Sequence, residues 1–193
     1  AGFPPDTFKT LIISTEQVEE VLENPRVRAA TLTGSVSAGA AVAKKSGALI
    51  KKTVLELGGS DPYLILEDAD VAAAAETCAK SRLINSGQSC IAAKRFIVVD
   101  SLREEFVDKV VQHMRNQKMG DPLKEETTVG PQARGDLREN LHRQVRDSIE
   151  KGARCLLGGE IPDGPGSYYP PTVLTDVKKG MPAFDEELFG PVA

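Results

Sequence analysis

Short apolar runs alternate with helix signals along the first part of the chain. The pattern predicts strands at 9–13, 28–33 and 52–57 and helices at 15–23 and 36–46. Ser14, with Gln17 three residues later, forms a capping box for the first helix, and Gly47 predicts the end of the second. Strands and helices that alternate at this spacing favour parallel βαβ units.

The alternation continues to the end of the chain. It predicts strands at 63–66, 95–99, 154–157 and 172–174 and helices at 71–86, 102–114 and 137–149. Asp70 is expected to cap the first of these helices, and Ser101 with Glu104 forms a second capping box. The whole pattern is that of an α/β protein built as two layered units, residues 1–58 and residues 59–193.

Composition narrows the classes of function. Hydrophobic residues make up 40% of the chain and charged residues 27%, a balance typical of soluble globular proteins. The formal net charge is −4, and no basic tract is interleaved with aromatic residues, so the sequence argues against a nucleic-acid partner. No apolar run reaches the roughly 18 residues that a membrane span needs.

The cysteines indicate a reducing compartment, and hence a cytoplasmic protein. They are three in number and widely spaced, which argues against a disulfide framework. No CxxC pair occurs, and the two histidines, His113 and His142, lie far apart in the sequence. We therefore expect no metal site.

Cys90 is the first candidate for chemistry. It follows a predicted helix and a glycine break, in the segment NSGQSC. A cysteine at such a turn can act as a nucleophile because the flanking backbone N–H groups stabilise a thiolate and a developing oxyanion. A cysteine considered singly is more often a small buried hydrophobe, and Cys78 and Cys155, in apolar contexts, fit that description.

Polar residues near the ends of predicted strands are further candidates. Glu56 ends an apolar strand before a glycine pair, where ligands bind in α/β sheets, although a carboxylate there can also lean into solvent. Gly34-Ser35 link a strand to a helix, a position suited to a phosphate or to an ordinary turn. Glu187 and Phe189 can bind ribose hydroxyls and pack on a flat ring, or form an acidic surface turn.

Four segments appear in one order: TLTGS with Gly39, LELGG, GQSC and ELFGP. Together, at these separations, they resemble the aldehyde dehydrogenase superfamily over essentially the whole chain. Longer stretches such as ELGGSDPYLILEDAD and GPQARGDLRENLHRQV look most like the bacterial NAD(P)-dependent succinate semialdehyde dehydrogenase branch. The resemblance implies an α/β fold in which residues 1–58 are the second, C-terminal half of a Rossmann-type NAD(P)-binding domain, and residues 59–193 are most of the α/β catalytic domain.

The resemblance also implies the reaction. It is the NAD- or NADP-dependent oxidation of a small aldehyde, with succinate semialdehyde as the expected substrate, through a thiohemiacetal and then a thioester on Cys90. Glu56 matches the base that activates water for thioester hydrolysis. The positions that match cofactor-binding residues are Gly34, Ser35, Leu57, Gly58, Glu187 and Phe189.

Two features set this chain apart from the family pattern. Many members dedicated to succinate semialdehyde carry an arginine just before the asparagine of NxGQxC, whereas this chain has Ile84, with Arg82 two residues further back. The chain begins at Ala1 rather than Met, and both ends look cut. We therefore expect an interior fragment of a homo-oligomeric enzyme, without the oligomerisation arm and the asparagine that completes the oxyanion site, and catalytically poor by itself.

Two other functions stay open. The chain could be a non-catalytic interaction module, since half of a parallel sheet leaves unpaired edges that invite association. It could also be a thiol hydrolase or acyltransferase, which would need His113 or His142 within hydrogen-bond reach of the Cys90 sulfur.

Overall fold

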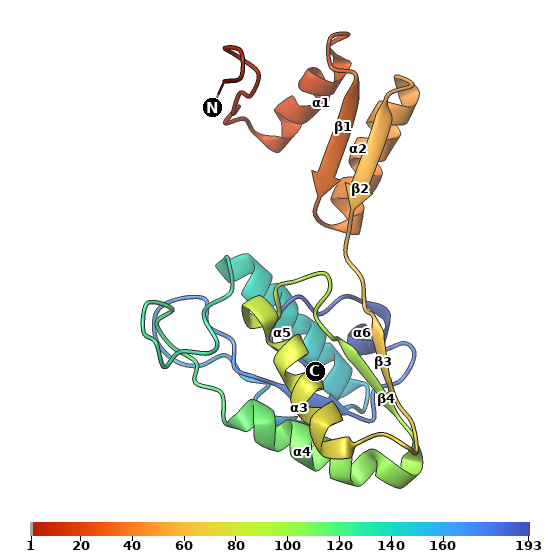
Figure 1. Ribbon diagram of the computed structural model, residues 1–193, viewed down its shortest axis with the longest axis vertical. Coiled ribbons are helices and arrows are strands. Elements are labelled where there is room, and N and C mark those ends of the chain that lie inside the picture. The colour runs from red at the N-terminus through yellow and green to blue at the C-terminus, as the bar shows by residue number, and fades with distance from the viewer. Residues whose placement is uncertain (1) are drawn as a thin grey trace. The chain divides into compact units, whose positions relative to one another are not determined.

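The chain folds as two compact units. The computed structural model describes residues 2–193; the first unit ends at Gly58, and the second runs from Gly59 to Ala193. Both units contain helices and strands (Figure 1), and the predicted α/β class is confirmed. Within the described residues, the strands form three separate two-stranded sheets, one in the first unit and two in the second.

The first unit is a parallel βαβ unit with one additional helix. Its elements are α1 (Thr15–Glu23), β1 (Ala29–Thr33), α2 (Val36–Ala48) and β2 (Lys52–Glu56). Both strands run in parallel, and α1 contacts α2, where Lys45 Nζ lies 2.5 Å from Glu23 Oε1 and 3.2 Å from Glu19 Oε2. Ser14 and Gln17 form the capping box that the sequence predicts at the start of α1.

Two expectations for the first unit are wrong. Residues 9–13 form no strand, and Ile12 is 99% exposed. An apolar run becomes a strand only where a neighbouring strand satisfies its backbone groups, and here β1 and β2 pair with each other. α2 also continues through Gly47, because Ile50, with a φ of 53°, takes the left-handed conformation just after the helix ends.

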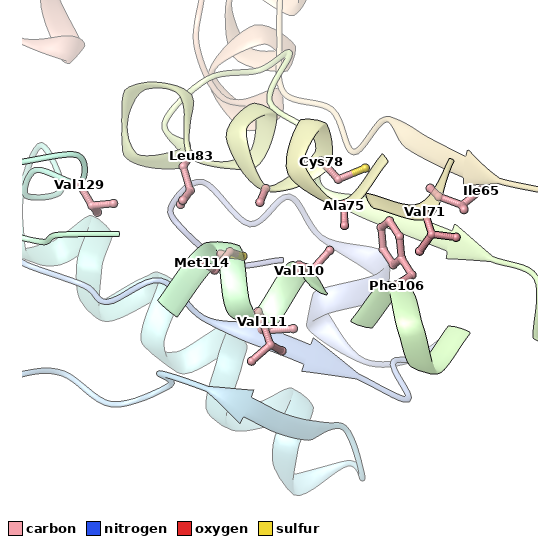
Figure 2. Close-up of a cluster of buried hydrophobic side chains, with 12 residues drawn as sticks. Ile65, Val71, Ala75, Cys78, Leu83, Phe106, Val110, Val111, Met114 and Val129 are labelled. Carbon is pink, nitrogen blue, oxygen red and sulfur yellow. The ribbon is translucent and has the colours of Figure 1, made fainter. Parts of the chain in front are cut away.

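The main core of the second unit lies against the sheet of β3 and β4. The elements around it are β3 (Pro62–Ile65), α3 (Val71–Arg82), β4 (Arg95–Val98) and α4 (Arg103–Arg115). The two strands pair in parallel, and α3 packs against α4, so that their buried side chains form one cluster (Figure 2). The Phe96 ring stands edge-on between two others, 6.2 Å from Tyr63 and 5.9 Å from Phe106 between ring centroids.

A second core holds the C-terminal segment. Its elements are α5 (Gly135–Glu150), β5 (Arg154–Leu157), β6 (Val173–Thr175) and α6 (Pro182–Asp185). β5 and β6 pair antiparallel, and α5 contacts α6. Gln144 Nε2 on α5 donates to the Glu187 carbonyl oxygen at 3.1 Å, which fixes the segment that follows α6. The buried apolar residues of this core are Leu141, Val145, Tyr169, Leu174, Leu188 and Val192.

The end of α3 and the start of α4 differ from what the sequence predicts. α3 ends at Arg82 rather than at residue 86, because Asn85 and Ser86 adopt left-handed backbone angles that no α-helix contains. Ser101 caps no helix: it lies in a short 3-10 turn, and α4 begins at Arg103 without a side-chain cap. Asp70 does cap α3, where its carboxylate accepts a hydrogen bond from the Ala73 N–H.

The described residues were compared with what a membrane-spanning helix and a metal site require. Among residues 2–193, no helix is both long enough and apolar enough to cross a bilayer. The same residues contain no group of three or more His, Cys, Asp or Glu side chains that could hold a metal ion.

Candidate active site

Cys90 lies just after a sharply bent turn that follows α3. Asn85, Ser86 and Gly87 have φ angles of 50°, 56° and 77°, so three consecutive residues adopt the left-handed conformation. Glycine is required at the third position because a side chain on Gly87 would also collide with the Gly190 carbonyl group. This close approach joins the turn to the C-terminal segment of the chain.

The three cysteines differ in exposure. Cys90 is exposed, Cys155 is half-buried, and Cys78 is buried in the cluster between α3 and α4. Burial raises the pKa of the Cys78 thiol to about 11 and also raises the pKa of the Cys155 thiol. Of the three thiols, that of Cys90 is the one open to a substrate.

Two buried cations hold the backbone around Cys90. Arg82 Nη2 donates to the Gly87 carbonyl oxygen at 2.6 Å. Lys94 Nζ donates to the carbonyl oxygens of Cys90, at 2.8 Å, and Ser89, at 3.3 Å. Burial lowers the pKa of Arg82 to about 10, still above neutral pH, so the guanidinium stays charged. The backbone of the turn is therefore held by hydrogen bonds from two buried, charged side chains.

Glu187 lies beside the same turn. Its Oε1 is 3.3 Å from Lys94 Nζ, in an ion pair whose side chains are 24% and 2% exposed, respectively. The contact lacks hydrogen-bond geometry, and within the described residues this buried oxygen accepts no hydrogen bond. The Glu187 side chain is nevertheless partly exposed beside the turn, and the exposed ring of Phe189 follows two residues later.

In the first unit, other candidates gather at the carboxyl ends of β1 and β2. The Gly34 N–H donates to the Glu56 carbonyl oxygen at 2.9 Å, so the turn after β1 contacts the end of β2. Ser35 caps α2, and its Oγ accepts a hydrogen bond from the Ala38 N–H at 3.2 Å. The Glu56 side chain is exposed, which agrees with the alternative in which this carboxylate leans into solvent. A helix N-terminus at this edge of a sheet suits an anion.

Leu57 packs on α2 at a glycine. A Cβ on Gly39 would lie 2.6 Å from Leu57 Cδ2, so the absence of a side chain on residue 39 lets the chain after β2 lie close to the helix. Leu57 and Gly58 are both half-buried, at the end of the first unit.

Each unit therefore assembles its own group of predicted residues. The second unit brings the Cys90 turn and Glu187 together through Lys94. The predicted residues of the first unit are Gly34, Ser35, Glu56, Leu57 and Gly58.

Sequence reasoning missed the two cations. Lys94 stands in AAKRF, between two buried alanines and a strand, and a lysine in so apolar a setting is the signal that could have found it. From the sequence, Arg82 is only a poor substitute for an arginine at position 84, whereas in the structure its side chain donates to the backbone of the turn.

The thiol hydrolase alternative gains no support, because among the described residues neither His113 nor His142 has a ring nitrogen hydrogen-bonded to Cys90. His142 Nδ1 lies 3.2 Å from the Tyr169 hydroxyl oxygen, so this ring is engaged within the second core. The charged side chain that contacts the backbone of Cys90 belongs to Lys94.

Comparison with known proteins decides the family. A model of the aldehyde dehydrogenase family matches residues 1–193, the whole chain. The chain belongs to the aldehyde dehydrogenase family. This membership confirms both the resemblance and the aldehyde dehydrogenase-like fold that the sequence motifs imply.

Several members of the aldehyde dehydrogenase family are similar to this chain throughout. The NADP(+) succinate-semialdehyde dehydrogenase of Mycobacterium avium is 50% identical over 192 residues, which are 100% of this chain and 41% of that protein. The NAD(P)+ succinate semialdehyde dehydrogenase Sad of Escherichia coli is 48% identical over 193 residues, which are 100% of this chain and 42% of Sad. The chain thus spans about two fifths of the length of these relatives.

A solved structure supports the fold. The succinic semialdehyde dehydrogenase of Streptococcus pyogenes, in complex with NADP+, is 38% identical and superposes with a TM-score of 0.90. The match covers 95% of this chain and 40% of that one.

Proposed function

We propose that the full-length protein oxidises an aldehyde to a carboxylic acid, with NAD or NADP as the hydride acceptor. The observation that carries the proposal is the contact of Lys94 with both the Cys90 turn and Glu187, which sets an exposed thiol near a carboxylate suited to a cofactor. In this proposal, residues 1–58 are the second half of the cofactor domain and residues 59–193 belong to the catalytic domain.

Cys90 is the nucleophile. Its sulfur attacks the aldehyde carbon and forms a thiohemiacetal, whose oxyanion accepts a hydrogen bond from the Cys90 N–H. The exposure of this side chain supports access for the aldehyde. The hydrogen bonds from Arg82 and Lys94 support a turn held in one position, which a reacting atom requires.

The residues present fit a nicotinamide dinucleotide. When bound, the cofactor supplies the hydride acceptor that converts the thiohemiacetal into a thioester. The partly exposed carboxylate of Glu187 suits a ribose hydroxyl, with Phe189 beside it. The Gly34-Ser35 turn, at the N-terminus of a 13-residue helix, suits the pyrophosphate.

Glu56 is the general base. It takes a proton from a water molecule, the water attacks the thioester, and the acid leaves while Cys90 returns as a thiolate. Its position at the carboxyl end of β2, in contact with the Gly34 turn, supports this role. Leu57 and Gly58 follow it directly and would line the nicotinamide.

Succinate semialdehyde is the substrate that we propose. Both curated relatives described above are named for it, and their names give NADP(+) and NAD(P)+ as cofactors. Here Ile84, which is 49% exposed, replaces the arginine that many such enzymes use for the distal carboxylate. Another residue of the full-length protein must therefore bind that carboxylate.

We also propose a cytoplasmic location and a homo-oligomeric enzyme. The location is supported by three free cysteines, which a reducing compartment maintains. The oligomer is supported by family membership, and its arm would lie outside this chain.

Turnover of succinate semialdehyde tests the proposal. The full-length protein should produce NADH or NADPH, and Cys90→Ser should abolish this because a hydroxyl is a far weaker nucleophile than a thiolate. The 193-residue chain alone should show little turnover, since the loss of one oxyanion donor costs about 10²–10³ in rate. Cys155→Ser is the matched control and should keep full activity. Turnover that survives in Cys90→Ser would refute the assignment.

A further inference from the structure

Lys94 makes three contacts, of which two are hydrogen bonds and the third is an ion pair. Nζ lies 2.8 Å from the Cys90 carbonyl oxygen, 3.3 Å from that of Ser89 and 3.3 Å from Glu187 Oε1. The side chain is 2% exposed, so water screens these contacts little. A buried charge thus stands at the point where the nucleophile turn and the C-terminal segment meet.

The contact with Ser89 sets the direction of the Cys90 N–H. The Ser89 carbonyl and the Cys90 N–H belong to one trans peptide unit, in which the C=O and N–H bonds point in opposite directions. Because the Ser89 oxygen accepts from Lys94 Nζ, the Cys90 N–H points away from Lys94. A cation on this carbonyl also polarises the amide and strengthens its N–H as a donor.

The contact with Glu187 places the second group. Its side chain is 24% exposed, and without the ammonium beside it the carboxylate would lose its ion pair and keep only the more distant charge of Arg82 as compensation. Removal of Lys94 would therefore disturb two groups that are 97 positions apart in the sequence (187 − 90 = 97).

We propose that Lys94 is a positioning residue, which sets the direction of the Cys90 N–H and the place of the Glu187 carboxylate together. This inference rests on the proposed function, in which the first group holds the oxyanion and the second binds the cofactor ribose. Lys94 itself touches neither substrate nor cofactor. Its loss weakens oxyanion stabilisation and cofactor binding at once.

The test is Lys94→Met in the full-length protein, which keeps an apolar stem and removes the charge. The kcat should fall because the charge-assisted hydrogen bonds to the turn are lost, and the cofactor Kd, measured by calorimetry without turnover, should rise because the ion pair with Glu187 is lost, each by about 10- to 100-fold. Lys94→Arg, which keeps a cation, should recover part of both. Lys80→Met is the matched control, since that side chain is 73% exposed and pairs with Glu76 on the same helix.

A double-mutant cycle separates positioning from general damage. If Lys94 acts through Glu187, then Glu187→Gln raises the cofactor Kd less in the Lys94→Met background than in the wild type. Fully additive effects, or wild-type kcat and Kd in Lys94→Met, would overturn the inference and leave the proposed function standing. A wild-type protein without aldehyde oxidation would instead refute the proposed function.

Folding of the variant is checked through Cys78, which stays protected from alkylation while the core is intact. Should Lys94→Met fail to fold, Lys94→Arg decides: the inference predicts a lower kcat and a higher cofactor Kd than in the wild type, because a planar guanidinium does not reproduce the contacts of the ammonium, and wild-type values for both contradict it.

Discussion

At the scale of single residues, burial divides the three thiols into different chemical classes. Cys78 is 2% exposed within the α3–α4 cluster, and burial raises its pKa to about 11, so almost no thiolate forms at neutral pH. Cys155 is half-buried, and its Sγ lies 3.2 Å from the Leu157 carbonyl oxygen. The Cys90 side chain, by contrast, is exposed to solvent.

Thiol labelling should follow this order. In the folded protein at about pH 8, iodoacetamide should modify Cys90 first, Cys155 more slowly and Cys78 last, because the reagent needs both access and thiolate. Peptide mass spectrometry over a time course measures the three rates. In denaturant the three should converge, which serves as the control. Labelling of Cys78 as fast as that of Cys90 in the folded state would contradict the burial.

The sequence predicts single residues well where a local signal exists and poorly where a distant contact decides. The glycine break before Cys90 is a local signal, and the bent turn is found there. The ion pair of Lys94 with Glu187 joins residues 93 positions apart (187 − 94 = 93), so no local pattern reveals it. The exposure of Glu56 is also set by what surrounds β2 and not by its own strand pattern.

At the scale of elements, a capping signal is effective only where the backbone starts a helix. Asp70 and Ser101 both look like N-caps in the sequence. Asp70 Oδ1 accepts from the Ala73 N–H at 3.1 Å, whereas Ser101 falls inside a 3-10 turn that precedes α4. The run at 9–13 shows the same dependence for strands, since its apolar pattern lacks a pairing partner in the described chain.

The true cap Asp70 and the false candidate Ser101 give a matched pair of variants. Asp70→Ala should lower the free energy of unfolding by about 1 kcal/mol, because it leaves a helix N–H without its acceptor. Ser101→Ala should change it by less than about 0.5 kcal/mol, as an exposed side chain without a capping bond. Urea unfolding followed by circular dichroism measures both. Equal losses for the two variants would show that the capping contact is not the cause.

At the scale of the whole molecule, the proposed chemistry is divided between two compact units. The second unit holds the thiol and the carboxylate for the ribose, and the first holds the phosphate turn and the general base. Family motifs made this division predictable, because TLTGS lies within the first unit, GQSC and ELFGP lie within the second, and LELGG ends at the boundary between them. Hydrophobic periodicity alone predicts the α/β class but names no chemistry.

The central claim is that Cys90 carries the acyl group and that Glu56 activates the water that removes it. Its most direct test is peptide mass spectrometry of full-length Glu56→Gln, quenched after mixing with succinate semialdehyde and cofactor. We expect a thioester to accumulate on Cys90, with about one equivalent of reduced cofactor, because acylation proceeds while hydrolysis stalls. An unchanged steady rate with no acyl group on Cys90, or an acyl group on another cysteine, would contradict it.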